Sequence, residues 1–226
     1  MKTGIIVAMD KELQLLLPLL GSSKGTVTVN NSTFYRGEIA GHEVIVTKCG
    51  IGKVNAAVGT LTLIETFHPA LIVNSGVAGG TGAGTQPLGI LDIIVPDEIA
   101  YHDVWCGPGT ELGEAAGCPA RFTSPADDEI RKKLNAKGGL LASGDIFVDK
   151  KNDLDRILSL YPDAKAVDME SAAIAHVCHL KGVPFICLRV ISDTPGNDGN
   201  AAAYNNFWED APKRTFAAVE QLLALL

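Results

Sequence analysis

Apolar runs rich in valine and isoleucine recur along the chain, and segments with helical spacing of apolar residues lie between several of them. The runs predict strands over Gly4–Ala8, Glu43–Lys48, Ala70–Asn74, Ile90–Pro96, Ala164–Met169 and Pro184–Ile191. The other segments predict helices over Lys11–Leu20, Lys53–Thr66, Asp127–Leu134, Leu154–Leu160, Ser171–Lys181 and Ala211–Leu226. Continuous apolar strands that alternate with helices are typical of a sheet covered on both faces, so the pattern predicts an α/β fold.

Two further segments refine this prediction. Thr26–Ile39 is more polar and resembles a β-hairpin, which indicates a mixed sheet. Cys106–Pro119 is rich in glycine and proline and predicts a long loop, and long loops inside compact domains are often functional. Neither an internal repeat nor a low-complexity linker interrupts the 226 residues, so we expect one domain over residues 1–226.

The composition is that of a globular protein with a large core, because 46% of the residues are hydrophobic and 20% are charged. A formal net charge of -7 without a basic cluster argues against nucleic acid as the main partner. The five cysteines form no C-x-x-C pair, which favours free thiols in a reducing compartment over disulfides or a zinc site. The N-terminal apolar run is too short for a signal-peptide core, and no run approaches the length of a membrane span. We therefore expect a cytoplasmic protein without membrane contact.

The first candidate for chemistry is Ala166–Ala175, in which Asp168, Met169 and Glu170 lie between a short apolar strand and a helix of small residues. Carboxylates in apolar surroundings need a partner that stabilises their charge. Ligands of α/β sheets bind at the ends of strands, and a ligand rich in hydroxyl groups is one such partner. Strand alternation points Asp168 away from Met169, so we expect Asp168 to lie outside the site.

Acidic and glycine residues follow two other predicted strands. Glu12 falls in the first turn of the predicted N-terminal helix, where the helix dipole favours an ionised carboxylate that can act as a general base. Acidic residues are also common there as plain helix stabilisers. The glycines of Asn74–Gly80 let the backbone approach a ligand closely, although a tight turn explains them as well. A loop and another strand follow them in place of a helix, which argues against a dinucleotide-binding fingerprint.

Two later segments add an aromatic side chain, an arginine and a third acid. Phe147, beside a Ser-Gly-Asp turn, is suited to stack on a flat heterocycle, although an isolated phenylalanine more often belongs to a core. Arg189 interrupts an apolar strand, and a buried arginine needs a carboxylate or anion partner. Asp193 ends that strand and either exchanges a proton with a ligand nitrogen or serves as a turn residue before Pro195. Capping explains each residue singly, but not three acids and an arginine at the ends of separate buried strands.

Eight segments, in order along nearly the whole chain, resemble the bacterial 5′-methylthioadenosine/S-adenosylhomocysteine nucleosidases, within the wider nucleoside phosphorylase group. The segments are GIIVAMDKEL, CGIGKVNAA, VNSGVAGG, VPDEIAYHD, GCPARF, SGDIF, AVDMESAAIAHVC and RVISD. The resemblance implies a three-layer α/β/α sandwich around a twisted mixed sheet, usually a homodimer. It also implies hydrolysis of the N-glycosidic bond of a 5′-thioadenosine, a small-molecule nucleoside, with no metal or other cofactor.

The resemblance further implies roles for single residues. Glu12 matches the catalytic base, Asp193 the acid that protonates the purine, and Arg189 the arginine near the attacking water. Glu170 and Met169 match the pair at the ribose, and Phe147 and Val148 match the adenine-binding positions. Other binding positions are Val77, Ala78, Gly79 and Ser192, together with Ile51 and Phe207 in a 5′-thio pocket. The segment near Val104–Trp105 of a partner subunit is expected to complete that pocket.

The chain departs from the family pattern at several positions. Val77 stands where serine or threonine commonly helps to hold the water, so we expect water placement to rest more on Glu12 and Arg189. The same valine, together with an acid at Glu12 that repels an anion, favours a hydrolase over a phosphorylase. Asp168 replaces the more usual glutamate, Leu91 a frequent glycine, and Trp105–Gly117 is less regular than the family pattern. The alternatives are a nucleosidase for a related substrate such as futalosine, a phosphorylase, and a non-catalytic nucleoside-binding protein.

Overall fold

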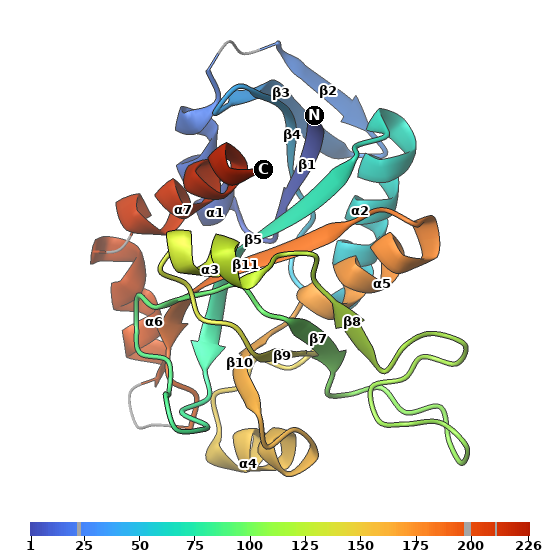
Figure 1. Cartoon of the computed structure of the whole chain (residues 1–226), viewed down its shortest axis with the longest axis vertical. Coiled ribbons are helices and arrows are strands. Elements are labelled where there is room, and N and C mark those ends of the chain that lie inside the picture. Colours follow the sequence, from blue (N-terminus) through green and yellow to red (C-terminus); the bar gives the residue numbers. More distant parts are fainter. Residues whose placement is uncertain (22–23, 197–199, 211) are drawn as a thin grey trace.

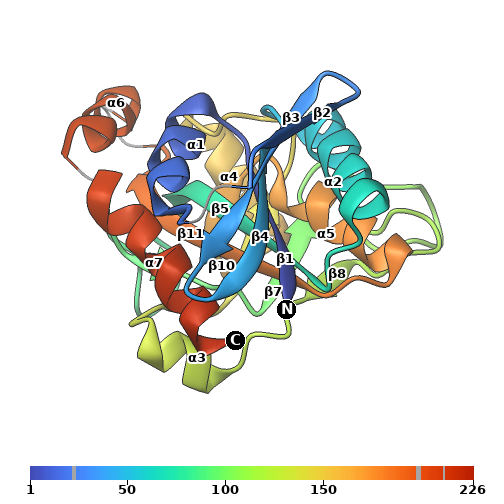
Figure 2. The same ribbon diagram turned by 90° about the horizontal axis from the view of Figure 1, so that it is seen from above.

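A twisted mixed β-sheet forms the centre of the molecule, and helices cover both of its faces (Figure 1, Figure 2). The structure, a computed structural model, describes residues 1–21, 24–196, 200–210 and 212–226. The strands are β1 (Lys2–Val7), β2 (Thr26–Val29), β3 (Ser32–Ile39), β4 (His42–Lys48), β5 (Leu71–Gly80), β6 (Ile93–Ile94), β7 (Glu98–Tyr101), β8 (Arg121–Thr123), β9 (Leu140–Ser143), β10 (Ala164–Asp168) and β11 (Phe185–Asp193). The helices are α1 (Asp10–Leu16), the 3-10 turn η1 (Leu17–Leu19), α2 (Lys53–Phe67), α3 (Asp128–Lys133), α4 (Lys151–Leu160), α5 (Ser171–Lys181), α6 (Asn200–Asp210) and α7 (Pro212–Leu225). The expected α/β/α layering is confirmed.

Strand β1 shows how one apolar run serves two layers. Ile5 and Val7 pack with residues of α1 and α7 in one core cluster, whereas Ile6 packs with residues of α2 and α5 in another. Figure 2 shows these two helix pairs on opposite sides of the sheet. Because neighbouring residues of a strand point to opposite faces, a continuous apolar run such as this one requires helices on both sides.

Strand β5 brings the ends of several strands together. It pairs in parallel with β1 and β11, and through Gly79 and Gly80 it pairs antiparallel with β10. The sequence predicts a strand only over Ala70–Asn74, but the glycines continue it because their backbone pairs with the strands on both sides. Glycine is needed at position 79, since a Cβ there would lie 2.6 Å from Cγ of Pro195. The carboxyl ends of β1, β5 and β11 therefore lie at the same end of the sheet.

Other predicted elements agree with the structure to different extents. The hairpin over Thr26–Ile39 is confirmed as the antiparallel pair β2 and β3, and Cys106–Pro119 is an irregular loop. The predicted strand Ile90–Pro96 is reduced to the two residues of β6. The sequence does not predict β7, β8 and β9, which extend the sheet beyond β10, nor α6. The first residue of the predicted helix Ala211–Leu226 lies outside the described residues.

Candidate active site

A cavity lies where the carboxyl ends of β1, β5 and β11 meet the segments that follow β9 and β10. Its wall is largely apolar, and four buried acids also line it: Glu12, Asp168, Glu170 and Asp193. Most of the predicted site residues are on this wall, namely Glu12, Ile51, Val77, Ala78, Gly79, Phe147, Val148, Met169, Glu170, Ser192 and Asp193. The fold thus gathers four acids from three separate segments into one small apolar space.

Glu12, the third residue of α1, is held by three backbone amides. Its Oε2 accepts hydrogen bonds from the amides of Ala8 and Met9, both at 2.9 Å, and its Oε1 accepts one from the amide of Val77 at 3.2 Å. A Cβ at position 76 would lie 2.5 Å from this Oε1, so the carboxylate reaches β5 only because Gly76 has no side chain. Amide donors and a helix N-terminus both stabilise the charged form of a carboxylate.

Burial acts on Glu12 in the opposite direction. Glu12 is only 2% exposed. Burial raises the pKa of Glu12, and it outweighs the positive charge of Arg189 and the three amide donors, which lower it. A general base works best when its pKa is close to the pH at which it operates, so a raised pKa suits a carboxylate that has to remove a proton from water.

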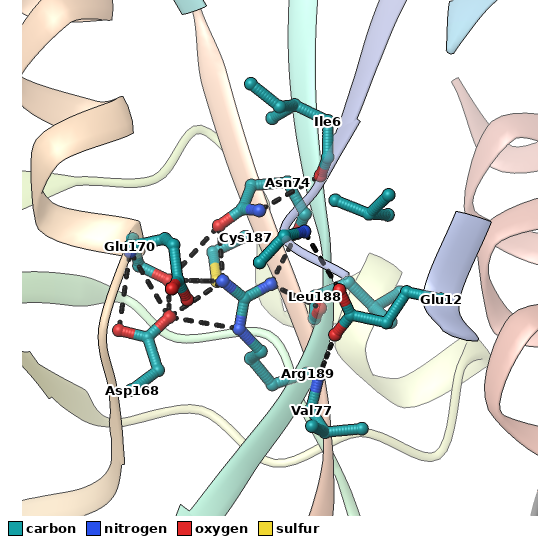
Figure 3. Close-up of polar contacts among 12 residues, drawn as sticks. Ile6, Glu12, Asn74, Val77, Asp168, Glu170, Cys187, Leu188 and Arg189 are labelled. Carbon is teal, nitrogen blue, oxygen red and sulfur yellow. Dashed lines mark hydrogen bonds and ion pairs between the residues drawn. The ribbon is translucent and has the colours of Figure 1, made fainter. Parts of the chain in front are cut away.

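Arg189 lies between Asp168 and Glu12 (Figure 3). Its Nη2 and Nε lie 2.7 and 3.1 Å from Oδ2 of Asp168, and it also donates to the side chain and backbone oxygens of Asn74 and to Oγ of Ser171. The guanidinium is therefore satisfied inside the protein, as a buried arginine must be. Arg189 is not on the cavity wall, so its influence on Glu12 is through its charge.

The expectation that Asp168 lies outside the site is wrong. Asp168 lines the cavity, pairs with Arg189, and accepts hydrogen bonds from the amide and hydroxyl groups of Ser171. Strand β10 ends at Asp168, so Met169 and Glu170 have already left the strand. Alternation between the two faces of a strand therefore does not relate their directions to that of Asp168.

Glu170 follows directly and precedes α5. Its Oε1 accepts a hydrogen bond of 2.8 Å from the amide of Gly52, at the N-terminus of α2. Burial, together with the negative charge of Asp168, raises the pKa of Glu170 to about 8. A carboxyl group that exchanges its proton near neutral pH can both donate and accept hydrogen bonds, which suits it to the hydroxyl groups of a sugar.

Asp193 ends β11 and is 4% exposed. Burial raises the pKa of Asp193, and the hydrogen bond from Ser192 opposes that shift. The bond from Oγ of Ser192 to Oδ1 of Asp193 measures 2.6 Å. A protonated aspartic acid on an apolar wall is a suitable donor to a ligand nitrogen. The sequence alone does not show that burial raises the pKa of Asp193 in this way.

Aromatic and sulfur-containing side chains form another part of the wall. Phe147 packs edge-to-face against Tyr204, with ring centroids 5.7 Å apart, and the hydroxyl of Tyr204 donates to the sulfur of Met9. Both Met9 and Tyr204 line the cavity, as Phe147 and Met169 do. The sequence analysis misses Tyr204 because it lies on α6, a helix that the apolar pattern does not predict.

Two predicted site residues are not on the cavity wall. One is Arg189, whose partners are described above. The other is Phe207, a residue of α6 that is buried against Val190 in a small cluster. Trp105, in the segment expected to reach a partner subunit, is 60% exposed and also lies away from this cavity.

The described residues lack two other kinds of feature. No group of histidine, cysteine, aspartate and glutamate side chains among them is arranged to hold a metal ion. None of the described helices is both long enough and apolar enough to cross a membrane.

Comparisons with known proteins place this geometry in context. The model of the phosphorylase superfamily matches residues 2–224. A 5′-methylthioadenosine/S-adenosylhomocysteine nucleosidase from Neisseria meningitidis, solved with methylthio-immucillin-A, is 32% identical with a TM-score of 0.90, covering 100% of this chain and 99% of that chain. An S-adenosylhomocysteine nucleosidase from Streptococcus pyogenes, in complex with 5-methylthiotubericidin, is 34% identical with a TM-score of 0.90 over 100% and 97%. A futalosine hydrolase from Helicobacter pylori is 28% identical with a TM-score of 0.88 over 100% and 98%.

Proposed function

Because this chain belongs to the phosphorylase superfamily, we propose that it is an N-glycosyl hydrolase that releases adenine from 5′-methylthioadenosine and S-adenosylhomocysteine. The observation that carries the proposal is the placing of Glu12, Glu170 and Asp193, three buried acids with raised pKa values, on the wall of one largely apolar cavity. The similar nucleosidases from N. meningitidis and S. pyogenes bind methylthio-nucleoside analogues.

The residues divide the reaction between them. Asp193 donates a proton to the purine and so makes it a better leaving group, while Glu12 removes a proton from the attacking water. Two carboxyl groups that flank a glycosidic bond share the work in the same way in inverting glycosidases. Glu170 holds the ribose hydroxyls, and the ionised carboxylate of Glu12 stabilises the positive charge that develops on the ribose in the transition state.

The nucleophile is water and not phosphate. The cavity presents the Glu12 carboxylate beside Val77, and a negative charge there disfavours a phosphate anion. The guanidinium of Arg189 is not placed to bind a phosphate there, since it is off the cavity wall and donates to Asp168, Asn74 and Ser171. Val77 contributes its amide to Glu12 and has no hydroxyl with which to bind either water or phosphate.

Similarity to the futalosine hydrolase makes futalosine the second candidate substrate. A substrate panel tests the proposal: 5′-methylthioadenosine, S-adenosylhomocysteine, futalosine and adenosine, each with and without phosphate. For each of the two thio-nucleosides, we expect adenine to be released at the same rate with and without phosphate. Preference for futalosine would replace the substrate assignment, strict phosphate dependence would show a phosphorylase, and tight binding without turnover would show a nucleoside-binding protein.

An exposed apolar face on α2 favours assembly as a homodimer. Val54, Val58 and Leu61 are 74, 54 and 37% exposed and lie one helical turn apart on this helix. Ile51, 52% exposed, joins this face to the cavity, which it also lines. A second copy of the chain on this face would bury the apolar residues and close the cavity near Ile51, where the 5′ substituent is expected to lie.

The proposed dimer is tested by placing a charge in the middle of this face. We expect Val58→Asp to sediment as a monomer at concentrations where the wild-type protein is a dimer, and to lose turnover of 5′-methylthioadenosine. Lys133→Asp, on α3, is the control because it adds negative charge to a surface that is polar already. A monomeric wild-type protein would contradict the assignment.

A further inference from the structure

Asp103, Asp145 and Lys53 tie together three segments, two of which carry cavity residues, Ile51 in one and Ile146–Val148 in the other. Oδ2 of Asp103 accepts hydrogen bonds of 2.8 Å from both the amide of Asp145 and Nζ of Lys53. Oδ1 of Asp145 in turn accepts one of 2.7 Å from the amide of Lys53. The contacts close a ring between the end of β7, the turn after β9 and the first residue of α2.

The ring adjoins Glu170 through the backbone. The amide of Gly52 donates to Glu170 and the next amide, that of Lys53, donates to Asp145. Two side-chain carboxyl groups thus accept hydrogen bonds from consecutive amides at the N-terminus of the fifteen-residue helix α2. Because the peptide between Gly52 and Lys53 is rigid, fixing the second amide also restricts the direction of the first.

Two glycines allow these groups to approach so closely. Gly52 has a φ of +93°, which side chains disfavour, and a Cβ there would lie 3.0 Å from Oδ1 of Asp145. A Cβ at position 144 would lie 2.7 Å from Cγ of Asp103. The two turns are therefore shaped around the carboxylates of Asp145 and Asp103.

The ion pair inside the ring is sheltered from water. The side chains of Lys53 and Asp103 are 25 and 17% exposed. Burial of Asp103 favours its neutral form, but the hydrogen bonds from Lys53 and from the amide of Asp145 prevail and lower the pKa of Asp103. Asp103 is therefore ionised at neutral pH and remains bound to both donors.

We propose that Asp103 and Lys53 are positioning residues for the sugar end of the site, acting through Asp145 and the Gly52–Lys53 peptide on Glu170. Neither residue lines the cavity, so they act on a ligand only through groups that do. The inference rests on the proposed function, in which Glu170 binds the hydroxyl groups of the sugar. It predicts that loss of the ring weakens binding of a ligand with a sugar part and spares binding of the free base.

Calorimetric titration with two probes, adenine and methylthio-immucillin-A, tests this without requiring turnover. We expect Asp103→Asn and Lys53→Met to weaken binding of the nucleoside analogue by about 10-fold or more, as loss of a residue that orients a metal ligand weakens metal binding. Adenine binding should change by less than about 2-fold. Lys53→Arg, which keeps a cationic donor, should retain most of the affinity. Asp155→Asn breaks an exposed pair with Lys151 on α4 and serves as the matched control.

A second measurement asks whether Asp103 acts through Glu170. In a Glu170→Ala background, Asp103→Asn should have little additional effect on binding of methylthio-immucillin-A, since the group that it positions is absent. Equal loss for adenine and the analogue, full additivity with Glu170→Ala, or equal loss in Lys53→Arg and Lys53→Met would overturn the proposal. If Asp103→Asn does not fold, as judged by thermal unfolding, the two Lys53 variants decide. Failure of the proposed function would instead show as wild-type protein that binds the analogue but releases no adenine.

Discussion

Arg189 and Asp168 form an ion pair of 2.7 Å in which each side chain is only 2% exposed. Asn74 and Ser171 complete the hydrogen bonds of the guanidinium, so its charge is fixed beside Glu12 (Figure 3). This pair links the end of β10, two residues before the proposed ribose-binding Glu170, to Glu12, the proposed base on α1. Its removal should therefore affect both stability and catalysis.

Asp168→Ala is expected to reduce the free energy of unfolding by about 3–5 kcal/mol, because it leaves a buried guanidinium without its anionic partner. Urea denaturation measures this change. Asp163→Ala is the control, since Asp163 pairs with Arg121 at the surface with 59% of its side chain exposed. The control should cost less than about 1 kcal/mol. Similar losses in the two variants would show that the buried pair has no special role.

Glu12→Gln should lower kcat for adenine release by about 10²–10⁴-fold, because an amide cannot remove a proton from water. It should also cost some stability, since the three backbone donors face both carboxylate oxygens and the side-chain nitrogen of glutamine, which takes the place of one of them, accepts no hydrogen bond. Asp10→Asn tests the same helical turn with an exposed acid that pairs with Lys48 and should keep its activity. Equal activity of Glu12→Gln and wild type would rule out the base assignment.

Asp193→Asn should lower kcat by a similar factor of about 10²–10⁴-fold, since asparagine has no acidic proton for the purine. In the wild type, activity should fall as the pH rises through the raised pKa of Asp193. Ser192→Ala removes a hydrogen bond that favours ionised Asp193, so this decline should move to higher pH. A decline that stays at the same pH in Ser192→Ala would show that another group sets it.

Glu170 should make the ligand-free protein less stable as the pH rises. Its pKa is 4.5 in an unperturbed chain and about 8 in the fold, so between these values the folded state binds a proton that the unfolded state has lost. The contribution is complete below the lower value and is lost as the pH passes the upper one. Unfolding at about pH 5.5 and about pH 8.5 should show this fall, and Glu170→Gln should reduce it. An unchanged fall in the variant would contradict the raised pKa.

The sequence predicts the strands whose apolar residues face helices on both sides, because such strands, β1 among them, are long continuous apolar runs that stand out in the sequence. It does not predict β8 or β9, whose three or four residues are too short to establish a period. It also ends β5 too early, because glycine is read as a turn residue when the partners that pair with it are unknown.

The sequence also predicts most of the cavity wall. The acids follow from their places at the ends of neighbouring strands, whereas residues such as Ile51 and Val148 follow only from the family resemblance. It cannot show that Arg189 is satisfied by Asp168 and Asn74, since those partners are far apart in the chain. Tyr204 and the ring of Asp103, Asp145 and Lys53 depend in the same way on how separate segments pack.

The most direct test of the central claim is adenine release from 5′-methylthioadenosine by the wild-type protein in phosphate-free buffer, followed by chromatography of the products. The account predicts adenine and the free thio-sugar at a rate that added phosphate does not increase. Absence of adenine without phosphate, or a sugar phosphate formed when phosphate is added, would contradict hydrolysis by water at this site.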